Sequence, residues 1–398
     1  MALLRSARFP AIILLSAAVL ALIVANSPLG PAVEGIKDSY IGIPGVFEMS
    51  VGHWVQDGLL AIFFFIVAVE LQYELTNGEL NSARKALQPA IAAAGGVIVP
   101  IGVFLLFAAG SDAANGWPIP TATDIAFALG VLAVFGKGLP SGIRIFLLAL
   151  AILDDIVGIV FIAVLFTNDV NVGLLALAAV AVVVFGFLSR QLDGRGRVPV
   201  SILLVVVGIA TWVLVYLSGV HATIAGVALG LAMAQQPALR TRHALEPWVN
   251  GIVLPLFAFS AALVAIPMVS PAQLSPAFWG ILVALPVGKI IGISVAGWVS
   301  LRIGNRGATP HLSLMDLIAA GALGGIGFTV SLLLSELAFA GDKLIRDEAT
   351  LGVLGGSAIS IVLAAIFVAQ RARHYRRTRP ATRDDALPET DSHEGQIA

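Results

Sequence analysis

The chain has 398 residues, of which 58% are hydrophobic and only 12% are charged, and its formal net charge is −1. Soluble proteins carry about 25% charged residues, so this composition excludes a soluble globular fold and indicates a polytopic membrane protein in a lipid bilayer. The absence of cysteine excludes disulfides, thiolate nucleophiles and cysteine-ligated metal sites. The near-neutral charge gives no indication of a nucleic-acid partner.

Twelve apolar stretches follow one another along the chain, and several are short or interrupted by glycine and proline. A helix needs about 20 apolar residues to cross a bilayer. The stretches cover residues 10–26, 53–75, 87–109, 118–135, 143–166, 172–189, 199–218, 220–235, 249–266, 275–301, 313–337 and 348–370. The sequence therefore predicts an all-α fold of about 12 transmembrane helices. The weakest division is at residues 218–221, which fit either a tight turn between two helices or a break inside one.

Basic residues are distributed unevenly between the connecting segments. If the N-terminus is cytoplasmic, 19 of the 23 Lys and Arg residues fall in cytoplasmic segments. Only Lys37, Lys343 and Arg346 fall outside, and Lys289 lies within a stretch. This asymmetry follows the positive-inside rule and predicts that both termini are cytoplasmic.

The first stretch has two interpretations. Its basic start and its run of about 16 apolar residues fit a secretory signal peptide. Residues Asn26-Ser27-Pro28 make a poor cleavage site, however, and this favours a retained helix.

The transmembrane domain is predicted to cover residues 1–370. Two segments lie outside the predicted helices, one within this domain and one after it. Residues 39–50 place a Pro-Gly turn between two β-prone runs, which fits an external hairpin or an irregular loop. Residues 371–398 are polar, with basic residues giving way to acidic ones, and are predicted to be a disordered cytoplasmic tail.

Two adjacent carboxylates, Asp154 and Asp155, occupy the middle of the apolar stretch 143–166. At about 1.5 Å of rise per residue, both lie roughly 15–18 Å from its ends, close to the centre of a bilayer. A carboxylate at that depth costs several kcal/mol unless it is protonated, paired or facing water. Neighbouring side chains on a helix point about 100° apart, so one can face a cavity while the other contacts a partner helix.

Lys289 is the cation expected at the same depth. It lies 12 residues or more from either end of the stretch 275–301, so its side chain cannot reach the membrane surface by snorkelling. A buried ammonium needs an anion, and Asp154 or Asp155 is the natural partner.

Two of the stretches are interrupted near their centres. In the first, Pro118 and Pro120 remove backbone donors just before Asp124, which can offset the positive end of the following half-helix. In the second, residues 321–327 contain four glycines, which favour either unwinding or close helix packing. The alternative for Asp124 is an N-cap near the membrane surface.

Corresponding interrupted helices in two halves of a transporter indicate a binding site. Each interruption here belongs to a set of three stretches, at 87–166 and 275–370. Each set contains three stretches and four stretches separate the sets, so the chain crosses the membrane an odd number of times from the start of one set to the start of the other, and the sets are predicted to be inverted-topology repeats.

Three further residues have open interpretations. His221 fits either a pH-responsive or a structural histidine. Glu70 and Glu74 are one helical turn apart and fit either an ion entry or a solvated helix end.

Together, these residues resemble the NhaA-type Na⁺/H⁺ antiporters of bacterial inner membranes. The resemblance covers residues 10–370. Its motifs are Val51-Gly52-His53-Trp54, Thr121-Ala122-Thr123-Asp124, Leu153-Asp154-Asp155, Gly219-Val220-His221, Leu254-Pro255, Gly288-Lys289 and Gly325-Ile326-Gly327-Phe328-Thr329.

The resemblance implies a twelve-helix fold with inverted repeats and two crossed, discontinuous helices. Asp155, with Asp154, would form the Na⁺ site, Asp155 being the principal ligand and proton acceptor and Asp154 the partner of Lys289. Asp124 and Lys289 would offset the half-helix dipoles, and Thr123 would lie beside the cation path.

The resemblance also implies that His221, Glu70 and Glu74 contribute to pH response and that the hairpin forms a homodimer interface. The sequence departs from better-known members at Gln72 and Tyr73, where they have basic residues, at Glu246, and at 260–262. These departures affect the expected pH set-point and ion selectivity.

The predicted function is electrogenic export of Na⁺ or Li⁺ in exchange for protons, serving pH and sodium homeostasis, and the resemblance implies two protons inward for each cation outward. It requires no cofactor and no covalent step, so the protein is predicted not to be an enzyme. One alternative is a Na⁺-coupled solute symporter of the same fold. An intramembrane aspartyl protease using Asp124 and Asp155 lacks the Gly-x-Gly-Asp motif, and a chromophore protein with a Lys289 Schiff base does not fit twelve helices.

Overall fold

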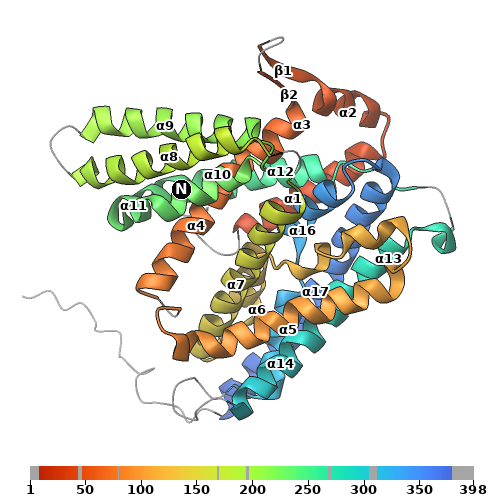
Figure 1. Ribbon diagram of the computed structural model, residues 1–398. Coiled ribbons are helices and arrows are strands. Elements are labelled where there is room, and N and C mark those ends of the chain that lie inside the picture. Colours follow the sequence, from red (N-terminus) through yellow and green to blue (C-terminus); the bar gives the residue numbers. More distant parts are fainter. Residues whose placement is uncertain are drawn as a thin grey trace, which may run out of the picture.

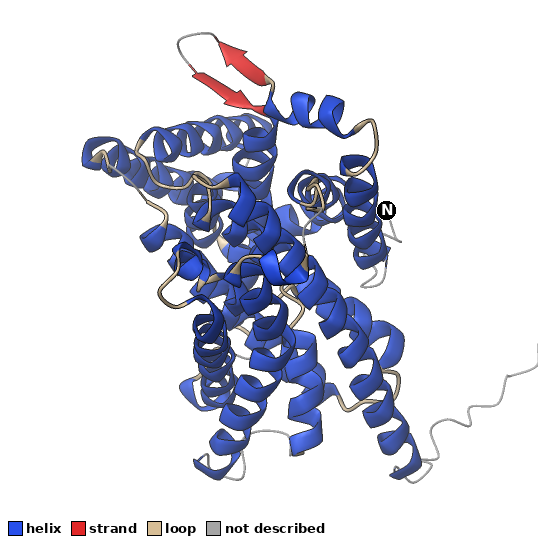
Figure 2. Ribbon diagram, turned by 90° about the vertical axis from the view of Figure 1, so that its right-hand side faces the viewer, coloured by secondary structure: helices blue, strands red, loops and turns tan. Residues whose placement is uncertain are grey.

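The computed structural model describes residues 9–43, 47–78, 80–167, 170–193, 197–267, 270–303 and 312–378. Figure 1 shows a bundle of helices from which one small β-hairpin projects, and Figure 2 shows the same hairpin beyond one end of the bundle. The hairpin pairs β1 (Tyr40–Ile43) antiparallel with β2 (Phe47–Ser50). Residues 40–43 and 47–50 therefore form the hairpin rather than an irregular loop.

The helices follow one another closely along the chain. The first half contains α1 (Phe9–Ala25), α2 (Gly30–Asp38), α3 (Val51–His53), α4 (Leu60–Thr76), α5 (Ala83–Ala108), α6 (Ile125–Phe135), α7 (Ser141–Leu165) and α8 (Val172–Ser189). The second half contains α9 (Arg197–Leu217), α10 (Thr223–Ala232), α11 (Gln235–Trp248), α12 (Leu254–Ala261), α13 (Pro276–Val283), α14 (Lys289–Ile303), α15 (Leu314–Gly324), α16 (Phe328–Ala338) and α17 (Lys343–Thr378).

Three π-helical turns join pairs of these helices into single spans. Trp54–Leu59 connects α3 to α4, Val249–Val253 connects α11 to α12, and Ala284–Gly288 connects α13 to α14.

Within the described residues, eight helices are long and apolar enough to cross a membrane. Three bent helix pairs bring the number of spans to as many as eleven, and α10 is a shorter apolar helix. This confirms an all-α polytopic fold of about 12 helices. Residues 218–221 form a turn between α9 and α10, and Gly219 adopts a φ of 84°, which glycine tolerates because it lacks a Cβ.

The last helix continues beyond the predicted start of the polar tail at residue 371. Arg371 Nε donates to Asp316 Oδ1 at 2.8 Å, and the Tyr375 hydroxyl donates to Asp316 Oδ2 at 2.8 Å. These contacts tie the end of α17 to the start of α15, so residues 371–378 are helical and the prediction of a disordered tail from 371 is wrong for them. The remainder of the predicted tail, 379–398, lies outside the described residues.

Close packing of α5 against α14 fixes the helix that begins with Lys289. Gly95 on α5 faces Gly292 on α14, and a Cβ added at either position would collide with backbone or side-chain atoms of the opposite helix. Small residues let two membrane helices approach closely, which increases their van der Waals contact. The packing thus requires glycine at residue 292.

We expect Gly292→Ala to lower the apparent Tm of the detergent-purified protein. Overpacking of this kind typically costs about 1–3 kcal/mol. Gly102→Ala on α5 is the matched control, because no atom lies within 4 Å of its added Cβ, and its Tm is expected to stay the same or rise. Equal Tm values for wild type and Gly292→Ala would contradict the packing described.

Candidate functional site

Both interrupted spans are broken in the structure, and the two breaks meet. Residues 112–121 and α6 are bent by 47° across residues 122–124, and α15 and α16 are bent by 50° across residues 325–327. The Asp124 amide donates to the Ile326 carbonyl at 2.6 Å, and the Thr123 hydroxyl lies 2.8 Å from the Gly324 carbonyl. Polar groups at the two breaks therefore hydrogen-bond to each other and connect the two broken spans.

Asp124 binds the N-terminal ends of two half-helices with one carboxylate. Its Oδ1 accepts from the Phe127 amide at 3.0 Å and thereby caps α6. Its Oδ2 accepts from the amide and the hydroxyl of Thr329, at 3.2 and 2.7 Å, in the first turn of α16. A negative charge is favourable beside helix N-termini, so one buried aspartate stabilises both.

Lys289 is fully buried, and its ammonium has three acceptors. Its Nζ lies 2.6 Å from Asp154 Oδ2 and 3.2 Å from Thr123 Oγ1, and it also donates to the Thr121 carbonyl. The Thr123 hydroxyl is also 2.7 Å from Asp154 Oδ2. Of the two aspartates that the sequence offered as partners, Asp154 is the one that Lys289 contacts.

A π-helical turn, Ala284–Gly288, leads directly into Lys289. Sequence reasoning alone misses this turn, although such turns occur often at functional sites. The available signal is Pro286, which has no amide hydrogen to donate to the preceding turn.

Asp155 is buried next to this network but lies outside it. The residue is 5% exposed, and its Oδ1 has no hydrogen-bond partner in the described part of the chain. Asp154 Oδ1 is likewise unpartnered there. A buried carboxylate oxygen without a donor requires a proton, a cation or water. The site thus combines one carboxylate neutralised by a lysine with a second that is available for a cation or a proton.

Comparison with known proteins identifies the family of the chain. Residues 1–368 match the family model described as Na⁺/H⁺ antiporter 1. The chain belongs to this family. It is 54% identical to "Na(+)/H(+) antiporter NhaA 2" of Clavibacter michiganensis, covering 98% of this chain and 96% of the relative. It is also 45% identical to "Na(+)/H(+) antiporter NhaA" of Tropheryma whipplei, covering 96% and 99%.

Membership of the Na⁺/H⁺ antiporter 1 family makes the chain a transporter rather than an enzyme. It also disfavours the aspartyl protease and chromophore alternatives. The chain is a multi-pass membrane protein, and its family implies that it requires no cofactor.

The residues expected to act in pH response lie apart from the central hydrogen-bond network. Glu70 on α4 forms an ion pair with Arg242 on α11, with 2.5 Å between Oε2 and Nη2. Glu74, one turn further along α4, is 8% exposed. Burial and pairing thus exclude a freely solvated helix end for either residue in this structure. The Glu70–Arg242 pair was not predicted, because the two residues are far apart in sequence.

His221 lies in the turn before α10 and contacts two polar side chains. Its Nε2 is 3.4 Å from Asp57 Oδ1, and its Nδ1 is 3.2 Å from Thr223 Oγ1. Asp57 belongs to the π-helical turn before α4 and is 7% exposed. His221 therefore connects the α9–α10 turn to the π-helical turn that precedes α4.

We expect Lys289→Ala to destabilise the protein more than Lys289→Ala combined with Asp154→Ala. Removing only the lysine leaves a buried carboxylate uncompensated, which typically costs 3–5 kcal/mol, whereas removing both partners costs less. Thermal unfolding of the purified variants measures the difference. A double variant that unfolds at or below the Tm of the single variant would contradict the pairing.

Proposed function

We propose that this chain exchanges Na⁺ or Li⁺ for protons across a bacterial inner membrane, and that the two ions compete for Asp155. The observation that supports this is the asymmetry of the adjacent carboxylates. Asp154 has a lysine partner, whereas the buried Oδ1 of Asp155 has none among the described residues. The names of the relatives also fit the exchange of these two ions.

Competition at one carboxylate explains obligatory exchange. Sodium is a hard cation that prefers carboxylate and carbonyl oxygens. A carboxyl group that holds a proton has lost its charge, so it binds Na⁺ weakly, and a carboxylate that holds Na⁺ is not protonated. Asp155 would therefore carry one ion in each direction.

Asp154 supplies a second part of the Na⁺ site and a route to a second proton. Its unpartnered Oδ1 can join Asp155 in binding Na⁺ while its Oδ2 faces Lys289. Because the site contains two carboxyl groups as well as the lysine, it can hold more than one proton. Two protons would then move inward for each Na⁺ outward, and the exchange would respond to membrane voltage.

Charged side chains at the ends of the broken helices surround this site. Asp124 offsets the positive ends of α6 and α16, and Lys289 donates to the carbonyl at the end of the short helix Ile119–Thr121. Thr123 positions both Asp154 and Lys289. Rocking of the two inverted repeats, at 87–166 and 275–370, against the other helices would expose the site alternately to each side.

The remaining features are consistent with this proposal. Both termini would be cytoplasmic, as the loop charges indicate. The hairpin carries Tyr40, Ile41 and Ile43 on its exposed surface, and these apolar side chains suit a homodimer interface. Glu70, Glu74 and His221 would adjust the rate to pH, and the exchange would serve pH and sodium homeostasis.

We expect Na⁺ to collapse a pre-formed ΔpH in everted membrane vesicles containing the wild-type protein, and Asp155→Asn to abolish this response. Asparagine has a similar shape but can neither accept a proton at physiological pH nor supply a negative charge. The measurement is dequenching of a ΔpH-sensitive dye after addition of Na⁺ or Li⁺.

Asp112→Asn is the matched control, because Asp112 is an exposed carboxylate outside the site. It should respond like the wild type. Wild-type vesicles that give no response to Na⁺ or Li⁺ between about pH 6 and 9 would contradict antiport and favour Na⁺-coupled solute symport.

A further inference from the structure

Helix α2 is a short charged helix that follows α1 after a bend of 112°. It lies next to the hairpin at one end of the bundle (Figures 1 and 2). It belongs to neither of the proposed repeats. By the loop-charge argument, this end of the molecule faces the outside of the cell.

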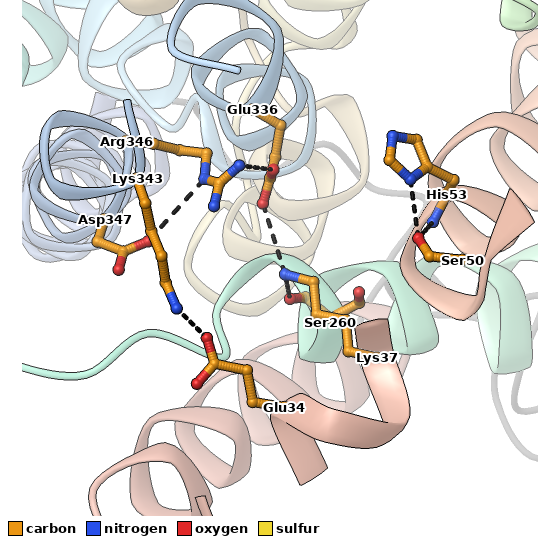
Figure 3. Close-up of polar contacts among 9 residues, drawn as sticks. All are labelled: Glu34, Lys37, Ser50, His53, Ser260, Glu336, Lys343, Arg346 and Asp347. Atoms are coloured by element: carbon orange, nitrogen blue, oxygen red, sulfur yellow. Dashed lines mark hydrogen bonds and ion pairs between the residues drawn. The ribbon is translucent and has the colours of Figure 1, made fainter. Parts of the chain in front are cut away.

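Two lysine–glutamate pairs connect α2 to α16 and α17. Lys37 Nζ on α2 lies 3.7 Å from Glu336 Oε1 near the end of α16. Glu34 on α2 pairs with Lys343 at the start of α17. Figure 3 shows the two pairs side by side, with Lys37 and Glu34 pointing from α2 towards the other helices.

Lys37 also contacts a helix outside the repeats. Its Nζ donates to the carbonyl of Ser260 on α12 at 2.9 Å. One ammonium therefore holds together α2, α12 and the outer end of the discontinuous span formed by α15 and α16.

The two pairs differ in their shielding from water. Glu34 and Lys343 are exposed, and exposed pairs contribute little to stability. Lys37 and Glu336 are more shielded, and Arg346 Nη1 lies 3.6 Å from the second oxygen of Glu336. We therefore take Lys37–Glu336 as the dominant contact.

A cavity of about 300 Å³ lies beside this contact. Both Lys37 and Glu336 line it, together with Gln56, Asp57 and His221. Contacts of α2 thus form part of the wall of a polar cavity at the outer end of the bundle.

We propose that α2 is a lid on the outer face of the transporter and that the Lys37–Glu336 contact is the latch that holds it closed. This rests on the proposed function, in which α16 and α17 move with their repeat relative to α2 and α12. Such a motion must separate Lys37 from Glu336 when the site opens outward. The latch therefore favours the state that is closed on the outside, and breaking it shifts the population towards the outward-open state.

The first test measures access to the cavity. The chain has no cysteine, so a single cysteine replacing Gln56 reports on the cavity wall without background. Lys37→Gln or Glu336→Gln should increase its labelling by a membrane-impermeant maleimide, added from the outside, roughly three- to tenfold, as expected for loss of one partly shielded contact. Asp38→Asn is the matched control on α2, since it retains both Lys37 and Glu336. In the Gln56→Cys background, this control should be labelled at the same rate as Gln56→Cys alone.

The second test locks the lid. Lys37→Cys combined with Glu336→Cys, joined by a short bismaleimide, should stop Na⁺/H⁺ exchange, whereas the same variant before linking should still transport. Lys343→Cys combined with Asp347→Cys places the linker within α17, and exchange should persist. If the double variant Lys37→Cys, Glu336→Cys inserts poorly into the membrane, Glu34→Cys with Lys343→Cys provides a second pair that links α2 to α17.

Unchanged labelling in both glutamine variants, or full exchange by a linked 37–336 pair, would overturn the latch. The labelling rate does not depend on which ion is transported. A failure of the wild type to exchange Na⁺ for protons would thus affect the proposed function and leave the labelling result as an independent test of the lid.

Discussion

The ion pair between Lys289 and Asp154 is the contact on which the rest of the site depends. Each of these charges would cost several kcal/mol if it were buried alone near the centre of a membrane. At 2.6 Å, and with Thr121 and Thr123 completing the hydrogen bonds of the lysine, the pair is nearly neutral as a unit. Pairing of Asp154 in this way leaves Asp155 as the neighbouring buried carboxyl group that has no basic partner among the described residues, and on this difference the proposed exchange rests.

In the unwound segments, charged side chains also compensate the unpaired polar groups of the backbone. Breaking two helices inside the membrane exposes two N-termini and two sets of carbonyls, which would be unfavourable in lipid. Asp124 accepts hydrogen bonds at both N-termini, while Lys289 and Thr123 donate to carbonyls at the opposite ends. The charged side chains thus stabilise unwound, polar backbone inside the bundle.

Much of this site could be predicted from the sequence because burial of charge is so costly. The depth of Asp154, Asp155 and Lys289 within their apolar stretches predicts pairing, and the proline- and glycine-rich interruptions predict the two breaks. Depth alone could not decide which aspartate contacts the lysine, because that depends on the rotation of α7 relative to α14. The packing of Gly95 against Gly292 helps to fix α14, and it is visible only in three dimensions.

Contacts between distant segments account for most of what the sequence did not reveal. The helical continuation to Thr378 depends on Arg371 and Tyr375 meeting Asp316, which lies 55 or more residues earlier in the chain. Local polarity at residues 371–378 favours a tail, and the tertiary contact overrides it. The pairing of Glu70 with Arg242 is a similar case.

The most direct test of ion competition at Asp155 is the affinity of the purified protein for Na⁺, measured by calorimetry as a function of pH. If Na⁺ displaces a proton, its Kd should rise as the pH falls, by up to about tenfold per pH unit for each proton displaced. In Asp155→Asn this pH-dependent binding should be lost. A Na⁺ affinity that stays constant between about pH 6 and 9 in the wild type would contradict competition at this carboxylate.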